Sequence, residues 1–241
     1  MTWKNKTMTT FIANKTEAQN ENFSSGAIKT GFHAGVITKA YERLSKSSAA
    51  KALHLDFMSF TGGFGSLDLW HTSGLGVQVD KNGKPLPAIA QINQLMALLG
   101  IESLTPNPNG KVEVYDWESK TTVERRMTTY PQLVNKTIGT VWQTEEYKKQ
   151  VDNGDGKWVD ASPLEITERA VWLKFCDSQT RQSAGEFING SEAKLIDQFL
   201  VGLDEVKRVK LSPSQVVTAS DTDAVKKAPN DFDFDAEEFP F

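Results

Sequence analysis

The sequence predicts a mainly β fold with two helices. Several short stretches alternate apolar and polar residues, and their apolar positions are rich in β-branched and aromatic side chains. Two other stretches repeat apolar residues at three- and four-residue spacing, as helices do. With 241 residues, the chain has room for one large domain or two small ones, and its single cysteine, Cys176, excludes an intramolecular disulfide.

Three strands are predicted at the start of the body. Residues 36–44 are β-branched and aromatic, as is typical of a strand. Residues 53–58 alternate leucine and phenylalanine with polar neighbours, which predicts a half-buried strand. The glycines of residues 62–65 then turn the chain into a third strand over residues 67–70. Together these elements form a three-stranded meander.

The clearest helix follows the meander. It is predicted to begin at Pro87, which suits a first helical turn, and to end near Gly100, which stands where a C-cap belongs. After it, residues 111–117 and 121–130 form two strand-like runs that indicate an inserted hairpin.

The second half of the body is also predicted to be mainly β. Residues 132–143 form a strand candidate. A second hairpin is expected to turn at residues 153–156, before a strand over residues 166–176. A second helix is predicted near residues 191–203, where five apolar residues share one face.

The order of three strands, one helix and further strands is the order of an OB-fold. We therefore expect an OB-fold-like Greek-key barrel, enlarged by the inserted hairpins, over residues 31–210. Residues 1–30 are predicted to be an N-terminal arm, residues 211–230 a flexible linker, and residues 231–241 a disordered acidic tail that binds a partner protein.

The tail combines five carboxylates with four phenylalanines and contains no basic residue. The carboxylates repel one another, and Pro240 prevents a helix or strand from finishing, so the tail cannot form an autonomous fold. A segment that serves only solubility does not need exposed rings, so we interpret the tail as a peptide ligand for a basic surface with an apolar pocket. The alternative is an ordinary acidic end. The predicted partner-binding residues are Asp231, Phe232, Asp233, Phe234, Asp235, Glu237, Glu238, Phe239, Pro240 and Phe241.

The charge of the chain is divided unevenly. Its net charge is −4, but residues 1–230 contain 26 acids and 27 bases once the tail is set aside. The body therefore has the capacity to present a basic face to an anionic partner, which is one of the sequence hints of nucleic-acid-binding proteins.

The body order and the tail together resemble bacterial and bacteriophage single-stranded DNA-binding proteins, which join an OB-fold to a linker and an acidic peptide ending in phenylalanine. The length and the inserted hairpins are similar to the phage proteins, whereas Phe232 and Phe234 depart from the plainer bacterial ending. The resemblance implies sequence-independent binding and protection of single-stranded DNA in replication, recombination and repair. It also implies a tail that recruits replication and recombination proteins, a possible homo-oligomer, and a place in the cytoplasm of an infected bacterium.

Binding single-stranded DNA requires rings on which bases stack and cations that contact phosphates. The sequence places aromatic and basic residues together at several strand positions. Taken singly, each ring has core packing as its alternative role, and each cation has solubility. The predicted DNA-binding residues are Lys39, Tyr41, Arg43, Trp70, Arg125, Arg126, Tyr130, Trp172 and Lys174.

Neither catalysis nor metal binding is predicted. The three histidines lack metal-ligand spacing, and we interpret His54 and His71 as partly exposed polar residues of strands. Residues 62–65 lack the ending of a phosphate-binding loop, and residues 152–156 lack the closing ligands of a calcium loop. We expect no cofactor, no metal and no enzymatic activity.

No stretch reaches the ~18 uninterrupted apolar residues of a membrane span, which predicts a cytosolic protein. The alternative function is a replication or recombination adaptor that acts through its tail and has no DNA affinity of its own.

Overall fold

The computed structural model describes residues 26–116, 119–152, 158–162 and 164–209. Most of the predicted N-terminal arm, the linker and the whole acidic tail lie outside these ranges. Within them, the fold is mainly β and predominantly antiparallel. No described helix combines the length and the apolar composition needed to cross a membrane.

The predicted meander is confirmed. It consists of β1 (Gly31–Leu44), β2 (Lys51–Ser59) and β3 (Phe64–Trp70), which pair antiparallel in this order. The first strand begins earlier than its sequence pattern predicts, because Gly31–Val36 pairs with a later strand on the other edge of β1. Ile28, which the sequence places in the arm, is buried in the main core.

The first predicted helix is confirmed as α2 (Pro87–Leu98). Pro87 occupies its first turn, and Gly100 follows the C-cap residue Leu99 with a left-handed φ of 62°. Leu95 and Leu98 pack into the main core, on the face of the meander that carries Leu53, Leu55 and Phe57.

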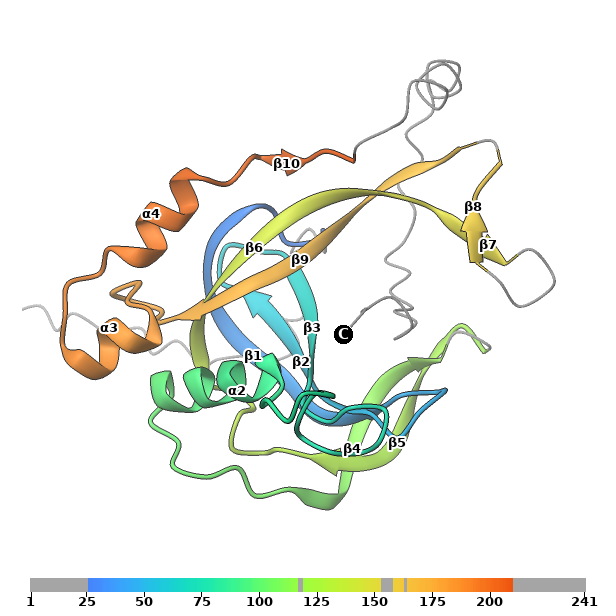
Figure 1. The fold of residues 1–241 in the computed structure, drawn as a ribbon, viewed down its shortest axis with the longest axis horizontal. Helices are drawn as coiled ribbons and strands as arrows, with labels where there is room; N and C mark the ends of the chain where they lie inside the picture. The colour runs from blue at the N-terminus through green and yellow to red at the C-terminus, as the bar shows by residue number, and fades with distance from the viewer. Residues whose placement is uncertain (1–25, 117–118, 153–157, 163, 210–241) are drawn as a thin grey trace, which may run out of the picture.

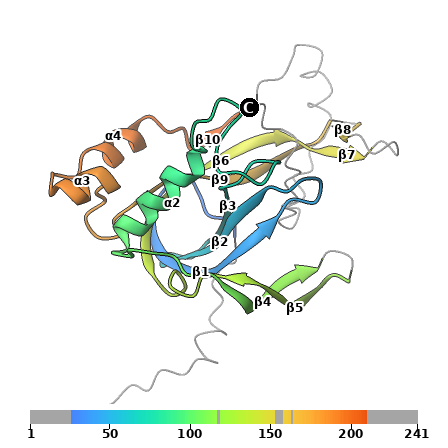
Figure 2. The same ribbon diagram turned by 60° about the horizontal axis from the view of Figure 1, so that its bottom comes forward.

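The later strands form two hairpins and a long antiparallel pair (Figure 1 and Figure 2). Their bounds are β4 (Asn107–Asp116), β5 (Thr121–Thr129), β6 (Thr137–Lys148), β7 (Gln150–Asp152), β8 (Trp158–Asp160) and β9 (Ile166–Cys176). Strand β9 has its predicted bounds. The prediction of β6 began too early, since residues 131–135 form a turn in which Asn135 has a φ of 63°.

The second predicted helix is confirmed in shorter form as α4 (Leu195–Val201), and a further helix that was not predicted, α3 (Ala184–Asn189), precedes it. Ser183 and Glu186 form a capping box that begins α3, and Gly190 ends it with a left-handed φ of 61°. Ile196 of α4 then packs on Val141 and Cys176 in a second, smaller core cluster.

The main sheet has the strand order β3-β2-β1-β6-β9, with β5 and then β4 branching from β1. A short parallel strand, β10 (Val206–Lys207), pairs with β6. The sheet is not a closed barrel, because no strand pairing joins β3 to β9 in the described ranges. Side-chain packing reaches β3 from the neighbouring strand instead: the indole of Trp142 on β6, which pairs with β9, lies against Gly65 of β3.

This packing predicts a strong effect of Gly65→Ala. A methyl group at Gly65 would lie 2.6 Å from the Trp142 ring, which is fully buried and has no room to move. We expect the variant to lose roughly 1–3 kcal/mol of unfolding free energy, measured by urea denaturation. Gly185→Ala in α3 is the matched control, because nothing lies within 4 Å of its added methyl group. Equal stability of the two variants would contradict the packing argument.

Candidate functional site

The outer face of the meander brings four of the predicted DNA-binding residues together. Successive residues of a strand point to opposite sides of its sheet. Lys39, Tyr41 and Arg43 therefore share the outer face of β1, while Ala40 points into the core. Trp70 lies at the end of β3 opposite Ala52, which in turn lies opposite Arg43. The face thus contains two cations and two aromatic rings.

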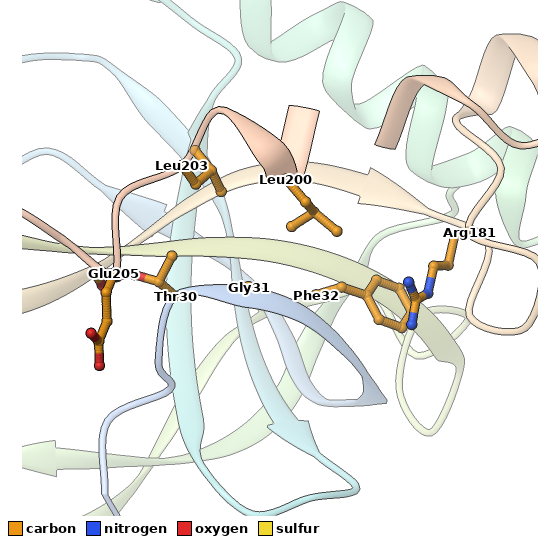
Figure 3. Close-up of a pocket in the computed structure, with 7 residues that line it drawn as sticks. All are labelled: Thr30, Gly31, Phe32, Arg181, Leu200, Leu203 and Glu205. Atoms are coloured by element: carbon orange, nitrogen blue, oxygen red, sulfur yellow. Dashed lines mark hydrogen bonds between the residues drawn. The ribbon is translucent and has the colours of Figure 1, made fainter. Parts of the chain in front are cut away.

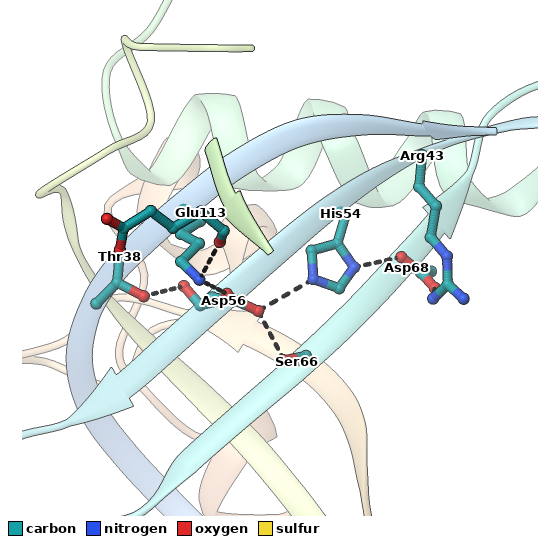
Figure 4. Close-up of polar contacts among 8 residues, drawn as sticks. Thr38, Arg43, His54, Asp56, Ser66, Asp68 and Glu113 are labelled. Atoms are coloured by element: carbon teal, nitrogen blue, oxygen red, sulfur yellow. Dashed lines mark hydrogen bonds and ion pairs between the residues drawn. The ribbon is translucent and has the colours of Figure 1, made fainter. Parts of the chain in front are cut away.

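A row of five charged side chains crosses this face (Figure 4). Arg43 Nη1 donates to Asp68 Oδ2 at 2.8 Å, and His54 Nδ1 lies 2.6 Å from Asp68 Oδ1. On its other side, His54 Nε2 lies 3.0 Å from Asp56 Oδ1, while Lys39 Nζ lies 3.4 Å from Asp56 Oδ2. We call these five residues the charged row.

The geometry of the row indicates that His54 is an imidazolium. Each ring nitrogen faces a carboxylate, and carboxylates accept hydrogen bonds, so both nitrogens carry a proton. Burial by itself lowers the pKa of His54, but the hydrogen bonds and charges of Asp56 and Asp68 outweigh burial and raise the pKa to about 9. His54 is only 9% exposed, which corrects our interpretation of a partly exposed residue.

The aspartate side of the row is equally well defined. Burial raises the pKa of Asp56, but the hydrogen bond and charge of His54, together with the hydroxyl of Ser66, lower it overall. Ser66 Oγ donates to Asp56 Oδ1 at 2.7 Å. Asp56 is therefore an ionised carboxylate at neutral pH, and its charge is balanced by His54 and Lys39.

Tyr41 covers the middle of the row. Its ring lies 4.6 Å from the His54 ring at an angle of 38°, and the residue is 9% exposed. Burial, followed by the charges of Asp56 and Asp68, raises the pKa of its hydroxyl. Tyr41 therefore shields the row from water and has little free ring surface for a base.

The β4–β5 hairpin borders this face. Thr129 of β5 pairs with Tyr41, and Lys39 Nζ donates to the backbone oxygen of Glu113 at 2.7 Å. Arg125 and Arg126 are both exposed on β5, but as neighbours in a strand they point to opposite sides of the hairpin. Arg125 lies 3.4 Å from Asp116 in an ion pair.

Three other predicted site residues lie elsewhere. Tyr130 and Trp172 pack against the main core, where the Trp172 and Phe175 rings are 4.4 Å apart. Lys174 Nζ lies over the Phe199 ring at 4.7 Å, beside α4. A β-bulge between Val141 and Trp142 shifts the register of β9, so the simple alternation of its residues does not continue along the strand.

Sequence reasoning missed several residues of this region. It did not select Asp56, Asp68 or His54, although all three alternate with leucines or phenylalanine in β2 and β3. It also missed Tyr115, which is exposed on β4. Tyr115 lies four residues after Lys111, which pairs with Arg126, and therefore on the same side of the hairpin. A strict period of two from Lys111 would have found Tyr115.

A second feature is a pocket of about 530 Å³ at the start of β1 (Figure 3). Its walls include Phe32, Leu200 and Leu203, and Arg181 lies over the Phe32 ring at 4.8 Å. Arg181 also pairs with Asp197 at 3.3 Å. This pocket contains none of the predicted DNA-binding residues.

The described ranges contain no group of histidine, cysteine and acidic side chains arranged to hold a metal ion. No known protein-family model matches the chain, and no curated protein matches its sequence. The predicted tail residues lie outside the described ranges, so their role stays a prediction.

The raised pKa of His54 predicts a specific loss of stability in mild alkali. Its charged form is favoured in the folded state, so its contribution is complete below pH 6.5 and is lost as the pH rises through about 9. We expect the wild-type chain to lose up to about 3 kcal/mol relative to His54→Gln between these values. Urea denaturation at several pH values measures the unfolding free energy of both proteins. A difference between them that does not change with pH would contradict the prediction.

Proposed function

We propose that the protein binds single-stranded DNA without reading its sequence, through the outer face of β1–β3 and the adjoining β4–β5 hairpin. The observation that carries the proposal is the position of Lys39, Arg43 and Trp70 on one face of the meander, where two cations and a half-buried aromatic ring lie together.

The strand order supports an OB-fold-like body. The chain forms a three-stranded meander, a helix and then β6 and β9, with the β4–β5 hairpin inserted before β6. OB-folds are partly open Greek-key barrels that bind oligonucleotides on the face of strands 2 and 3. The face of β2 and β3 that carries the charged row is the corresponding surface, and the missing pairing between β3 and β9 is compatible with a partly open barrel.

The hairpins supply further surface for a flexible strand. The β4–β5 and β7–β8 hairpins extend from the same side of the molecule (Figure 1 and Figure 2). Exposed Tyr115 and half-buried Trp70 offer rings for stacking, and Arg126 offers a cation. Stacking is tolerant of sequence because every base has a π-face, and it contributes about 1–3 kcal/mol per base.

We propose a second activity for the protein, which its acidic tail would carry. Its five carboxylates and four phenylalanines suit a basic surface that contains an apolar pocket. By the resemblance to phage single-stranded DNA-binding proteins, we propose that the tail recruits replication, recombination and repair proteins to DNA that the body has coated.

One observation favours a second function, that of an adaptor without DNA affinity. Lys39 and Arg43 are held by Asp56 and Asp68, and Lys111 and Arg125 are held by Glu124 and by Asp116, respectively. Cations that are already paired with carboxylates bind a phosphate less strongly. An adaptor would act through its tail alone, and DNA binding distinguishes the two functions.

The first test is a titration of the full chain with oligo-dT, followed by tryptophan fluorescence at several salt concentrations. We expect quenching by the single strand and a binding constant that falls steeply as salt rises, because phosphate contacts release counterions. Double-stranded DNA of the same length is the control. Absence of binding, also after removal of residues 231–241, would refute the proposal and favour the adaptor.

A second test separates the hairpin from the rest of the surface. Arg126→Ala is expected to weaken oligo-dT binding severalfold and to reduce the slope of log K against log salt by about 0.7, the value for one contact to single-stranded phosphate. Lys194→Ala is the matched control, because Lys194 precedes α4 and pairs with Glu192 far from this face. Equal effects of both substitutions would show that the change reflects net charge only.

A further inference from the structure

The charged row contains more cations than anions only while His54 is protonated. Arg43, Lys39 and the imidazolium carry three positive charges, whereas Asp56 and Asp68 carry two negative charges. With a neutral histidine, the two carboxylates would balance Lys39 and Arg43 completely. The surplus charge of this face therefore resides on a side chain that is almost completely buried.

The two oxygens of each aspartate contact different cations, and this arrangement leaves Lys39 and Arg43 on the solvent side of the row. His54 occupies the Oδ1 atom of each aspartate, whereas Lys39 and Arg43 contact the Oδ2 atoms. The lysine and arginine side chains are 38% and 28% exposed, compared with 8% and 12% for their aspartate partners. Both cations are thus at the solvent side of the row, where a phosphate has access to them.

From this arrangement we propose that His54 is a positioning residue for nucleic-acid phosphate. As an imidazolium it offsets part of the negative charge of Asp56 and Asp68, so that Lys39 and Arg43 can exchange their aspartate partners for phosphates of the bound strand. This inference rests on the proposed single-stranded DNA binding. It adds a form of regulation of that surface, because the DNA affinity depends on the proton of buried His54. The histidine itself does not contact the DNA.

The surroundings of His54 support this role. The groups that face it are Tyr41, Lys39 and Arg43 from β1, Asp56 from β2, and Asp68 and Ser66 from β3, while β4 contributes the Glu113 carbonyl to Lys39. Among these groups only the two aspartates carry negative charge, and His54 contacts both. Its pKa of about 9 keeps it protonated at neutral pH.

The test compares four forms of the full chain by oligo-dT binding at pH 7 and constant salt. The net charge of the row is zero in His54→Gln, one in the wild type and in the double variant His54→Gln/Asp56→Asn, and two in Asp56→Asn. We expect affinity to follow this order, with steps of roughly fivefold and with the double variant restored to the wild-type value. A histidine with a merely structural role would not be rescued by a second substitution.

The wild-type chain gives an independent readout that needs no variant. Between pH 7 and pH 9.5 its affinity is expected to fall, and its salt slope to decrease by about 0.7 for each phosphate contact that is lost. His33→Gln is the control and keeps this pH dependence, because His33 contacts Lys29 and Ser59 away from the row. Circular dichroism at each pH shows that the chains stay folded.

The outcomes separate the inference from the proposed function. Wild-type binding with an affinity and salt slope that do not change with pH would overturn the role of His54 alone, as would a double variant as weak as His54→Gln. No wild-type binding at any pH would overturn the DNA-binding proposal and this inference with it.

Discussion

The contact between Trp142 of β6 and Gly65 of β3 joins two strands that do not pair, across the main core. β3 and β9 are joined by no strand pairing within the described residues, and the indole of Trp142, on the neighbouring strand β6, packs on β3. Trp142 also lies 6.2 Å from the Phe57 ring, and its Nε1 donates to Thr140 Oγ1 at 2.8 Å. The contact lies on the apolar face of the meander, which packs into the main core, and the charged row lies on the opposite face.

Two charged residues of the outward face are buried, whereas the cations beside them reach solvent. His54 and Asp56 are 9% and 6% exposed, and a charge removed from water costs several kcal/mol unless it is paired. Each member of the charged row depends on its neighbours for this pairing. Loss of one partner leaves an uncompensated buried charge, so the row acts as a unit and keeps Lys39 and Arg43 in defined positions.

Much of the fold could be predicted from the sequence, because period-two alternation is strong in β2 and β3 and α2 has both a proline start and a glycine end. The prediction failed where local pattern and tertiary structure diverge. The start of β1 lacks alternation and is a strand because β6 pairs with it. The separate helix α3 is signalled only by Ser183 and Glu186, a capping box that is easily overlooked within a polar stretch.

The candidate site was predictable to a similar degree and for similar reasons. Alternation placed Lys39, Tyr41 and Arg43 on one side of β1, and the structure confirms this. It could not show that Tyr41 would be covered or that each cation would meet an aspartate, because those contacts depend on the register between strands. Trp172 shows the same limit, since a bulge in the β6–β9 pair determines where its ring lies.

Under the proposed function, the charged row links stability and DNA binding through the same side chains. A surface that offered Lys39 and Arg43 without Asp56 and Asp68 would repel itself and leave the long side chains disordered until a ligand arrived. Aspartates alone would position the cations but neutralise them. A buried imidazolium between the two carboxylates resolves this conflict, because it preserves the positions while returning one positive charge to the face. Order in the free protein and attraction for an anionic strand are then compatible.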